Sequence, residues 1–309
     1  PDDTIRITEV SPRDGLQNEA TPIPTADKAK LVRLLSRSGV DEVEVSSFVS
    51  PKWVPQLGDA QELFAAVADM KPEGLIFSAL VPNAKGLEGA LAVNETIQAR
   101  LIDKISVFTA ASETFSKKNT NAGIAETIER FREVVSGAKE EQLALRGYIS
   151  CAIECPFEGP IEPGRVAEVV DRLLELGIEE IDLGDTIGKG TPKTMAALLE
   201  AVQTRIEATP GAWLTVHLHD TFGGASACVK TALDMGVRSF DGSAAGLGGC
   251  PYAATESGGR APGNISTESL MRAITDAGYT TKIDAQAMNE ASEFAAGLIA
   301  PREPEGGTA

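Results

Sequence analysis

The two histidines of the chain, His217 and His219, lie two residues apart in the stretch VHLHDTFGG (216–224). Residues i and i+2 of a β-strand face the same side, so both imidazoles project in one direction, about 6–7 Å apart along the strand. Two imidazoles on one face suit a divalent metal ion. A pair of hydrogen-bonded histidines in a core gives the same motif, so the motif alone leaves both interpretations open.

A carboxylate that could join these imidazoles is Asp14, in the segment SPRDGLQNE (11–19). Two histidines and one carboxylate form a facial metal site. Completion by an asparagine or by water favours Mg2+ or Mn2+, whereas a site of histidine and carboxylate alone also allows Fe2+ and oxygen chemistry. These ligand types disfavour a cysteine-rich zinc site.

Arg13 precedes this carboxylate in the sequence. A permanently charged guanidinium beside a metal ligand is costly unless an anion or a carboxylate pairs with it, and Glu44 is the carboxylate that we expect there. Arg13 could then stabilise a developing oxyanion or enolate. A buried structural ion pair is the alternative interpretation.

A glycine-rich segment, GLGGCPYAATESGGRAPGN (246–264), carries a single cysteine, Cys250. Its glycines predict a loop flexible enough to act as a lid over a site. In such a lid Cys250 could serve as a thiol acid, base or nucleophile. A lone cysteine is more often an inert small residue, and its place in the loop is what favours a function.

These residues fall at the ends of short β-rich runs that alternate with amphipathic helical stretches. The expected strands are 5–10, 42–48, 75–81, 104–110, 145–152, 179–185, 214–220 and 238–245, with helical patterns such as 27–39, 125–138, 165–177 and 191–207. We expect Gly39, Gly137 and Gly177 to end three of the helices. Eight strand–helix units predict a parallel (β/α)8 TIM barrel in one domain, 1–309, with an additional C-terminal helix over 284–300. An open doubly wound sheet is the alternative.

Catalytic groups of a TIM barrel lie at the C-terminal ends of the strands and in the loops that follow them. Asp182 and Asp185 end the sixth expected strand, and the two histidines end the seventh. Asp14 follows the first strand, which meets the eighth when the barrel closes. The barrel therefore predicts that the histidines, Asp14 and the glycine-rich lid share one mouth.

The formal net charge is −17, from 28 basic and 45 acidic residues. This charge argues against a nucleic acid or an anionic membrane as a partner, although a few local cations could still hold a small anion. Four cysteines in 309 residues do not form a disulfide framework. This cysteine content predicts a reduced, cytosol-like compartment, so we expect a cytoplasmic protein. No apolar run approaches the ~20 residues of a membrane helix.

Several segments, in this order, resemble the 3-hydroxy-3-methylglutaryl-CoA (HMG-CoA) lyase family. They are SPRDGLQNE, SSFVSPKWVPQLGD, AASETFSKKN, RGYISCAIECPFEG, LGDTIGKGTP, HLHDTFG, AGLGGCPYA and GN-x-x-TE, between residues 4 and 300. The HxHD motif and the leading RD are shared with isopropylmalate and citramalate synthases. RDGLQNE, SFVSPKWVPQ and GGCPYA are specific to the lyases.

The resemblance implies cleavage of HMG-CoA to acetyl-CoA and acetoacetate with Mg2+ or Mn2+. The implied metal ligands are Asp14, His217, His219 and Asn264. The implied catalytic residues are Arg13 for the enolate of the departing acetyl-CoA, Glu44 and Asp185 as supporting acids, and Cys250 as the lid thiol used in proton transfer. Residues expected to contact the substrate or CoA are Gln17, Ser47, Asp182, Thr186, Lys117, Lys118, Asn119 and Arg260. The expected partners are an acyl-CoA and further copies of the chain, in a homodimer or a larger homo-oligomer.

Two features depart from the family pattern. Ten residues, ATESGGRAPG, separate PYA from Asn264 and make the lid several residues longer, and Asp182 stands where family members commonly have serine. Both leave the acyl group of the substrate open. A Claisen-type synthase of the same superfamily and a non-catalytic, metal-dependent binder of an acyl-CoA or organic acid are the alternative functions.

Overall fold

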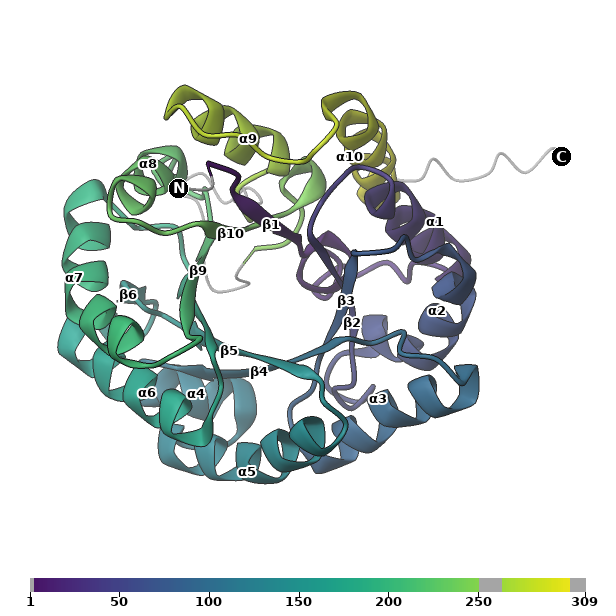
Figure 1. Cartoon of the computed structure of the whole chain (residues 1–309), viewed down its shortest axis with the longest axis horizontal. Coiled ribbons are helices and arrows are strands. Elements are labelled where there is room, and N and C mark those ends of the chain that lie inside the picture. Colours follow the sequence, from purple (N-terminus) through teal and green to yellow (C-terminus); the bar gives the residue numbers. More distant parts are fainter. Residues whose placement is uncertain (1–2, 250–262, 301–309) are drawn as a thin grey trace, which may run out of the picture.

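The computed structural model describes residues 3–249 and 263–300. Within them, eight parallel strands close into a barrel in the order β1-β10-β9-β8-β5-β4-β3-β2, and helices surround it (Figure 1). The barrel strands are β1 (Arg6–Glu9), β2 (Glu42–Ser47), β3 (Ile76–Leu80), β4 (Lys104–Ala110), β5 (Ala144–Ser150), β8 (Glu180–Asp185), β9 (Trp213–Leu218) and β10 (Ser239–Gly242). The predicted TIM barrel is confirmed, because β1 pairs with both β10 and β2 and leaves no open edge there.

Ten α-helices accompany the strands in the described residues. They are α1 (Thr25–Ser36), α2 (Ala60–Val67), α3 (Ala84–Ile97), α4 (Glu113–Thr120), α5 (Ile124–Glu140), α6 (Pro163–Leu176), α7 (Pro192–Ala208), α8 (Ala225–Asp234), α9 (Thr267–Asp276) and α10 (Ala285–Ile299). Those for which the sequence predicted a range (α1, α5, α6, α7 and α10) begin and end close to it. The predicted C-terminal helix is α10, which packs against α1 and α9. None of the described helices is both long and apolar enough to cross a membrane.

Successive side chains of a barrel strand point alternately to the surrounding helices and to the barrel interior. In β2, which reads EVEVSS, every residue is buried. Val43 and Val45 belong to the apolar core beneath the helices, whereas Glu42 and Glu44 hold cations inside the barrel. The interior of this barrel is therefore polar, and Lys104 of β4 spans it by contacting Glu42 and Glu180 of β8.

The prediction that a glycine ends a helix is right for Gly177 and wrong for Gly137. Gly177 follows α6 in the left-handed conformation, with φ 81°, as a helix-ending glycine should. Gly137 was wrongly predicted as a helix end, since α5 continues to Glu140. A Cβ at Gly137 would lie 2.7 Å from Cδ2 of Leu87 in α3, so close packing of the two helices explains the glycine.

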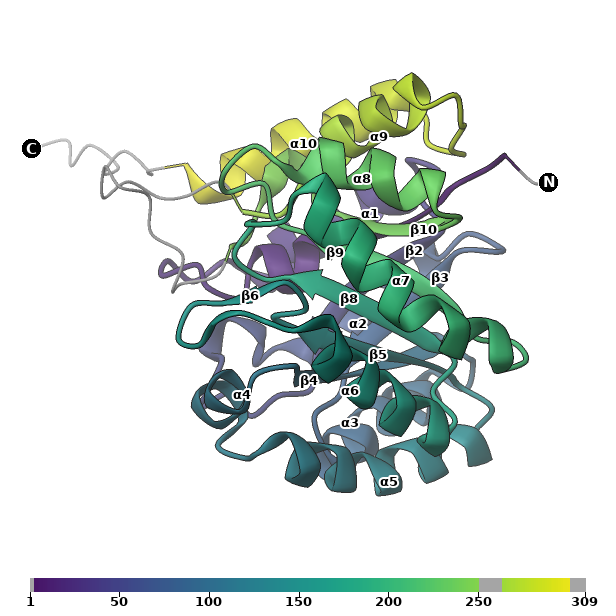
Figure 2. The same ribbon diagram turned by 90° about the vertical axis from the view of Figure 1, so that its left-hand side faces the viewer.

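The segments after the strands build the mouth of the barrel. Residues Ser11–Gly15 form a π-helical turn after β1, and a small hairpin of β6 (Glu154–Cys155) and β7 (Gly159–Pro160) follows β5. Figure 2 shows this hairpin and α4 at the same end of the barrel. Chemistry-bearing side chains from the turn after β1 and from β2, β5, β8 and β9 converge at this end.

Candidate functional site

Three predicted ligands lie together at the mouth. Asp14, in the π-helical turn, and His217 and His219, at the end of β9, each offer a ligand atom, and these atoms lie within 4.8 Å of one another. The two Nε2 atoms are 3.3 Å apart. At this distance one ring can donate its N–H to the other, and in the tautomers without these protons both lone pairs can face one cation.

Hydrogen bonds and burial prepare the two rings as ligands. Nδ1 of His217 lies 2.9 Å from Oδ2 of Asp241, so Nδ1–H donates to the carboxylate and Nε2 is the atom directed towards His219, where the neutral ring offers its lone pair. Burial lowers the pKa of His219 to about 4, with the nearby His217 adding to the effect. His219 is therefore neutral near pH 7, the form that binds a metal.

Asp14 and Asn264 complete the predicted ligand set. Nδ2 of Asn264 donates to Oδ2 of Asp14 at 2.8 Å and to the carbonyl of Leu247 at 2.9 Å. Oδ1 of Asn264 is buried and has no hydrogen-bond partner among the described residues. Burial alone would raise the pKa of Asp14, but the charge of Arg13 and the two histidines hold it at about 2. Two imidazoles, an ionised carboxylate and an available amide oxygen fit Mg2+ or Mn2+.

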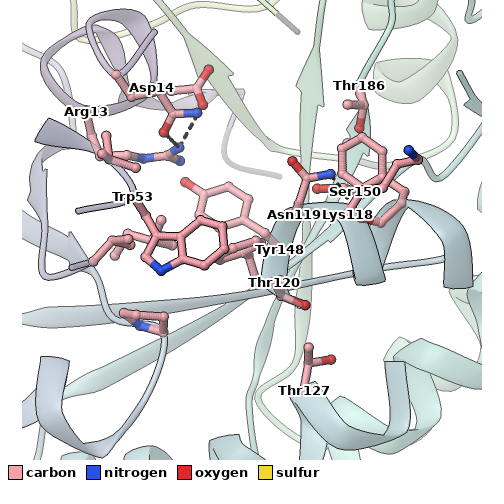
Figure 3. Close-up of a pocket in the computed structure, with 18 of the residues that line it drawn as sticks. Arg13, Asp14, Trp53, Lys118, Asn119, Thr120, Thr127, Tyr148, Ser150 and Thr186 are labelled. Carbon is pink, nitrogen blue, oxygen red and sulfur yellow. Dashed lines mark hydrogen bonds and ion pairs between the residues drawn. The ribbon is translucent and has the colours of Figure 1, made fainter. Parts of the chain in front are cut away.

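Arg13 is held by carboxylates on two sides. Its Nε donates to Oε2 of Glu44. Its Nη1 donates to Oδ1 of Asp14 at 2.7 Å (Figure 3). Burial opposes the charged form, but the charges of Glu44 and Asp14 raise the pKa of Arg13 further above its usual value. The expected pairing of Arg13 with Glu44 is present, and the guanidinium also borders a cavity.

The cavity has a volume of about 660 Å3 and reaches from the metal-ligand cluster to α4 and α5. Its described walls include four of the residues expected to contact the substrate or CoA: Gln17, Lys118, Asn119 and Thr186. Ser47, Lys117 and Asp182 are not among the described lining residues. The predicted Cys250 and Arg260 lie outside the described residues.

The two acids of β8 differ in depth. Asp185 ends the strand as expected, and its carboxylate accepts the backbone N–H groups of Lys189 at 3.1 Å and Gly190 at 2.7 Å. Burial raises the pKa of Asp185 to about 6. Asp182 was predicted to end this strand, and that prediction is wrong. Asp182 lies in the middle of β8 and is fully buried next to His217. The alternation of β8 turns Asp182 into the barrel, well below the mouth.

Sequence reasoning missed three residues of the site. Tyr148 of β5 borders the cavity beside Arg13, and Asp241 of β10 holds His217. Trp53 lines the cavity with 68% of its surface exposed. Strand alternation could have predicted that Tyr148 faces inward, because it lies two residues after Arg146 on the same face of β5. The sequence of one strand does not, however, predict which residues Tyr148 contacts across the barrel.

This chain is similar to known proteins over almost its whole length. The HMGL-like family model matches residues 4–295. The cytoplasmic HMG-CoA lyase of Mus musculus is 46% identical over 290 residues, which cover 94% of this chain and 80% of that protein. The HMG-CoA lyase crystal structure from Brucella melitensis has a TM-score of 0.87 at 44% identity and covers 96% of this chain and 98% of that one.

A further solved relative is the HMG-CoA lyase from Acinetobacter baumannii in complex with coenzyme A and 3-methylmalate. It is 34% identical, with a TM-score of 0.85, and covers 96% of this chain and 92% of that one. The family match over almost the whole chain and these relatives lead to one conclusion. The chain belongs to the HMGL-like family, which includes the HMG-CoA lyases.

Proposed function

We propose that this protein cleaves HMG-CoA, or a close 3-hydroxy-3-substituted acyl-CoA, to acetyl-CoA and a 3-oxo acid with the help of Mg2+ or Mn2+. The observation that carries the proposal is the convergence of Asp14, His217 and His219 beside Arg13 at the wall of the cavity of about 660 Å3. Membership of the HMGL-like family supports the same reaction.

The reaction breaks the bond between C2 and C3 of the acyl chain. The hydroxyl group on C3 loses its proton, C3 becomes the carbon of a ketone, and the electron pair of the broken bond passes to the thioester as an enolate. Protonation of that enolate at C2 gives acetyl-CoA. A general base, a site for the enolate charge and a general acid are therefore required.

The described residues supply much of this chemistry. A divalent ion held by Asp14, His217, His219 and Asn264 would act as a Lewis acid and lower the pKa of a bound hydroxyl group. Arg13 presents a fixed positive charge at the cavity wall, where it can stabilise the enolate oxygen. Asp185 holds the loop after β8 through the amides of Lys189 and Gly190, and so orients that side of the mouth.

The rest of the cavity offers contacts for CoA. The general acid that protonates the enolate is assigned to the lid. Lys118 and Asn119 of α4 line the cavity away from the metal ligands, where a cation and an amide suit the polar parts of CoA. The relative solved with coenzyme A supports an acyl-CoA substrate. We include Cys250 as the lid thiol in proton transfer and Arg260 as a lid contact of the acyl group.

The test is acetyl-CoA release from a panel of 3-hydroxy-3-substituted acyl-CoAs with Mg2+ or Mn2+. We expect cleavage of HMG-CoA or of one close analogue, and its loss in Arg13→Gln and His217→Ala. Arg165→Gln is a matched control, because Arg165 pairs with Glu158 on the surface and should not affect cleavage. Full activity of Cys250→Ala would refute the lid-thiol role alone.

The same assay separates the alternative functions. Condensation of acetyl-CoA with a 2-oxo acid, without cleavage of any panel member, would favour a synthase. Binding of an acyl-CoA without turnover would favour a non-catalytic binder. One catalytic domain, a cytoplasmic location and a homodimer or larger oligomer stay predictions of the sequence, and light scattering tests the last.

A further inference from the structure

We propose that Tyr148 is a positioning residue for Arg13: the ring of Tyr148 keeps one amino group of the Arg13 guanidinium directed into the cavity. The inference rests on the proposed function, in which Arg13 stabilises the enolate. Tyr148 comes from β5 and Arg13 from the turn after β1, so two strands that are not neighbours bring them together. Both side chains border the cavity (Figure 3).

The ring of Tyr148 lies against the charged end of Arg13. The guanidinium carbon is 5.4 Å from the ring centroid, within the range of a cation–π contact. The phenol oxygen lies 3.3 Å from Oε2 of Glu44 and accepts from Nη1 of Arg146 at 3.0 Å. The ring is therefore fixed at its hydroxyl end by two charged residues inside the barrel and cannot follow Arg13 if the guanidinium moves.

The hydrogen bonds of Arg13 leave one group free for a ligand. Nε donates to Glu44, and Nη1 donates to Asp14 and, at 3.5 Å, to Gln17. Within the described residues, no hydrogen bond involves Nη2. Since Arg13 lines the cavity, Nη2 is the group that can donate to a substrate oxygen.

This arrangement competes with a tighter pairing of Arg13 and Glu44. Arginine and carboxylate groups commonly form two parallel hydrogen bonds. Here Arg13 contacts only Oε2, and Oε1 of Glu44 is buried without a hydrogen-bond partner in the described part of the chain. Rotation of the guanidinium to reach Oε1 would draw an amino group away from the cavity. The Tyr148 ring against the guanidinium favours the observed orientation and opposes that rotation.

Two substitutions separate the ring from the hydroxyl group. Tyr148→Phe keeps the ring and removes only the hydroxyl contacts with Glu44 and Arg146, so its loss of kcat should be clearly the smaller of the two. Tyr148→Leu removes the ring and should lower kcat about 10- to 100-fold, because a small displacement of a catalytic group has effects of this size. KM should change far less than kcat, because Arg13 acts on charge that develops only in the transition state.

A double-mutant cycle distinguishes positioning from a merely structural role. In the Arg13→Gln background, measured by single-turnover kinetics at high enzyme concentration, Tyr148→Leu should change the rate by no more than about twofold. Melting temperature and Mn2+ affinity of each variant report on the fold and the metal site. Tyr279→Leu is the matched control, because Tyr279 also stacks on an arginine, Arg238, at 4.6 Å, but does not line the cavity.

The outcomes are distinct. Loss of activity in Tyr148→Leu that disappears in the Arg13→Gln background supports the inference. Equal losses in both backgrounds, or equal losses in Tyr148→Phe and Tyr148→Leu, overturn it and leave the proposed function standing. A wild-type protein that cleaves no acyl-CoA overturns the proposed function and this inference with it.

Discussion

Asp241 accepts a hydrogen bond from Nδ1 of His217 at 2.9 Å, and the two residues are direct partners across β10 and β9. The bond fixes the ring so that Nε2 of His217 is directed towards His219. Asp241 is itself anchored by Nη1 of Arg146 at 3.3 Å. The orientation of one expected metal ligand is therefore set from inside the barrel.

Asp241→Ala should weaken metal binding about 10- to 100-fold, because loss of the partner frees the ring to rotate and to exchange tautomers. The dissociation constant for Mn2+, measured by electron paramagnetic resonance, gives the effect independently of activity. Asp171→Ala is the control, since Asp171 pairs with Arg205 between outer helices. Unchanged Mn2+ affinity in Asp241→Ala, with the fold intact, would contradict this role.

Gly248→Ala should also weaken Mn2+ binding, through Asn264 and Asp14. Gly248 has φ +96°, and a Cβ there would lie 2.6 Å from Nδ2 of Asn264 and 3.1 Å from the carbonyl oxygen of Asp14. Relief of these contacts must displace the two expected ligands. Gly278→Ala has similar backbone strain at φ +86° but no atom within 4 Å of the new Cβ. If both variants lose Mn2+ affinity equally, backbone strain rather than ligand displacement is the cause.

The fold could be predicted from the sequence because the patterns that indicate strands and helices are local. Alternation in runs such as EVEVSS and helix-ending glycines such as Gly177 depend on neighbours along the chain. The common location of Asp14 and the histidines followed from the barrel, since parallel strands end at one mouth. Gly137 failed as a helix end because its reason is a contact with Leu87 on another helix.

The supporting residues of the site could not be predicted in the same way. Tyr148 meets Arg13, and Asp182 lies behind His217, because of the stagger between strands of a closed barrel. Alternation tells which side of a strand a residue faces but not its depth. Asp182 was expected near the substrate for this reason and instead lies fully buried below the mouth.

Lys104→Met should destabilise the fold by about 3–5 kcal/mol, the usual cost of breaking a buried ion pair from one side. Lys104 is buried between Glu42 and Glu180, and the substitution removes one of the two buried cations that these carboxylates share, the other being Arg146. Urea unfolding measures the change. Lys230→Met is the matched control, because the pair of Lys230 and Asp234 is exposed on α8 and should contribute close to nothing. Similar losses in the two variants would argue against a structural role for the buried cluster.

Glu9 should make the stability of the protein fall as pH rises through the weakly acidic range. Glu9 is fully buried at the end of β1, and burial raises its pKa from 4.5 to about 7 despite hydrogen bonds from Ser11 and Thr267. A folded-state pKa above the unfolded value means that the fold favours protonated Glu9. Its contribution to stability is therefore complete below pH 4.5 and is lost between pH 4.5 and 7.

Glu9→Gln removes this titration and keeps the acceptor for the backbone amides of Ser11 and Ala244, at 3.0 and 2.8 Å. The hydroxyl group of Thr267 can rotate to accept from the new amide. Relative to wild type, the variant should gain about 2.5 kcal/mol in the free energy of unfolding between pH 5 and pH 8, at 1.36 kcal/mol per pKa unit. Urea unfolding at several pH values, with the exposed Glu133→Gln as control, measures the difference. A constant difference across this range would show that Glu9 is ionised in the folded protein, because the buried hydrogen bonds then outweigh the cost of burial.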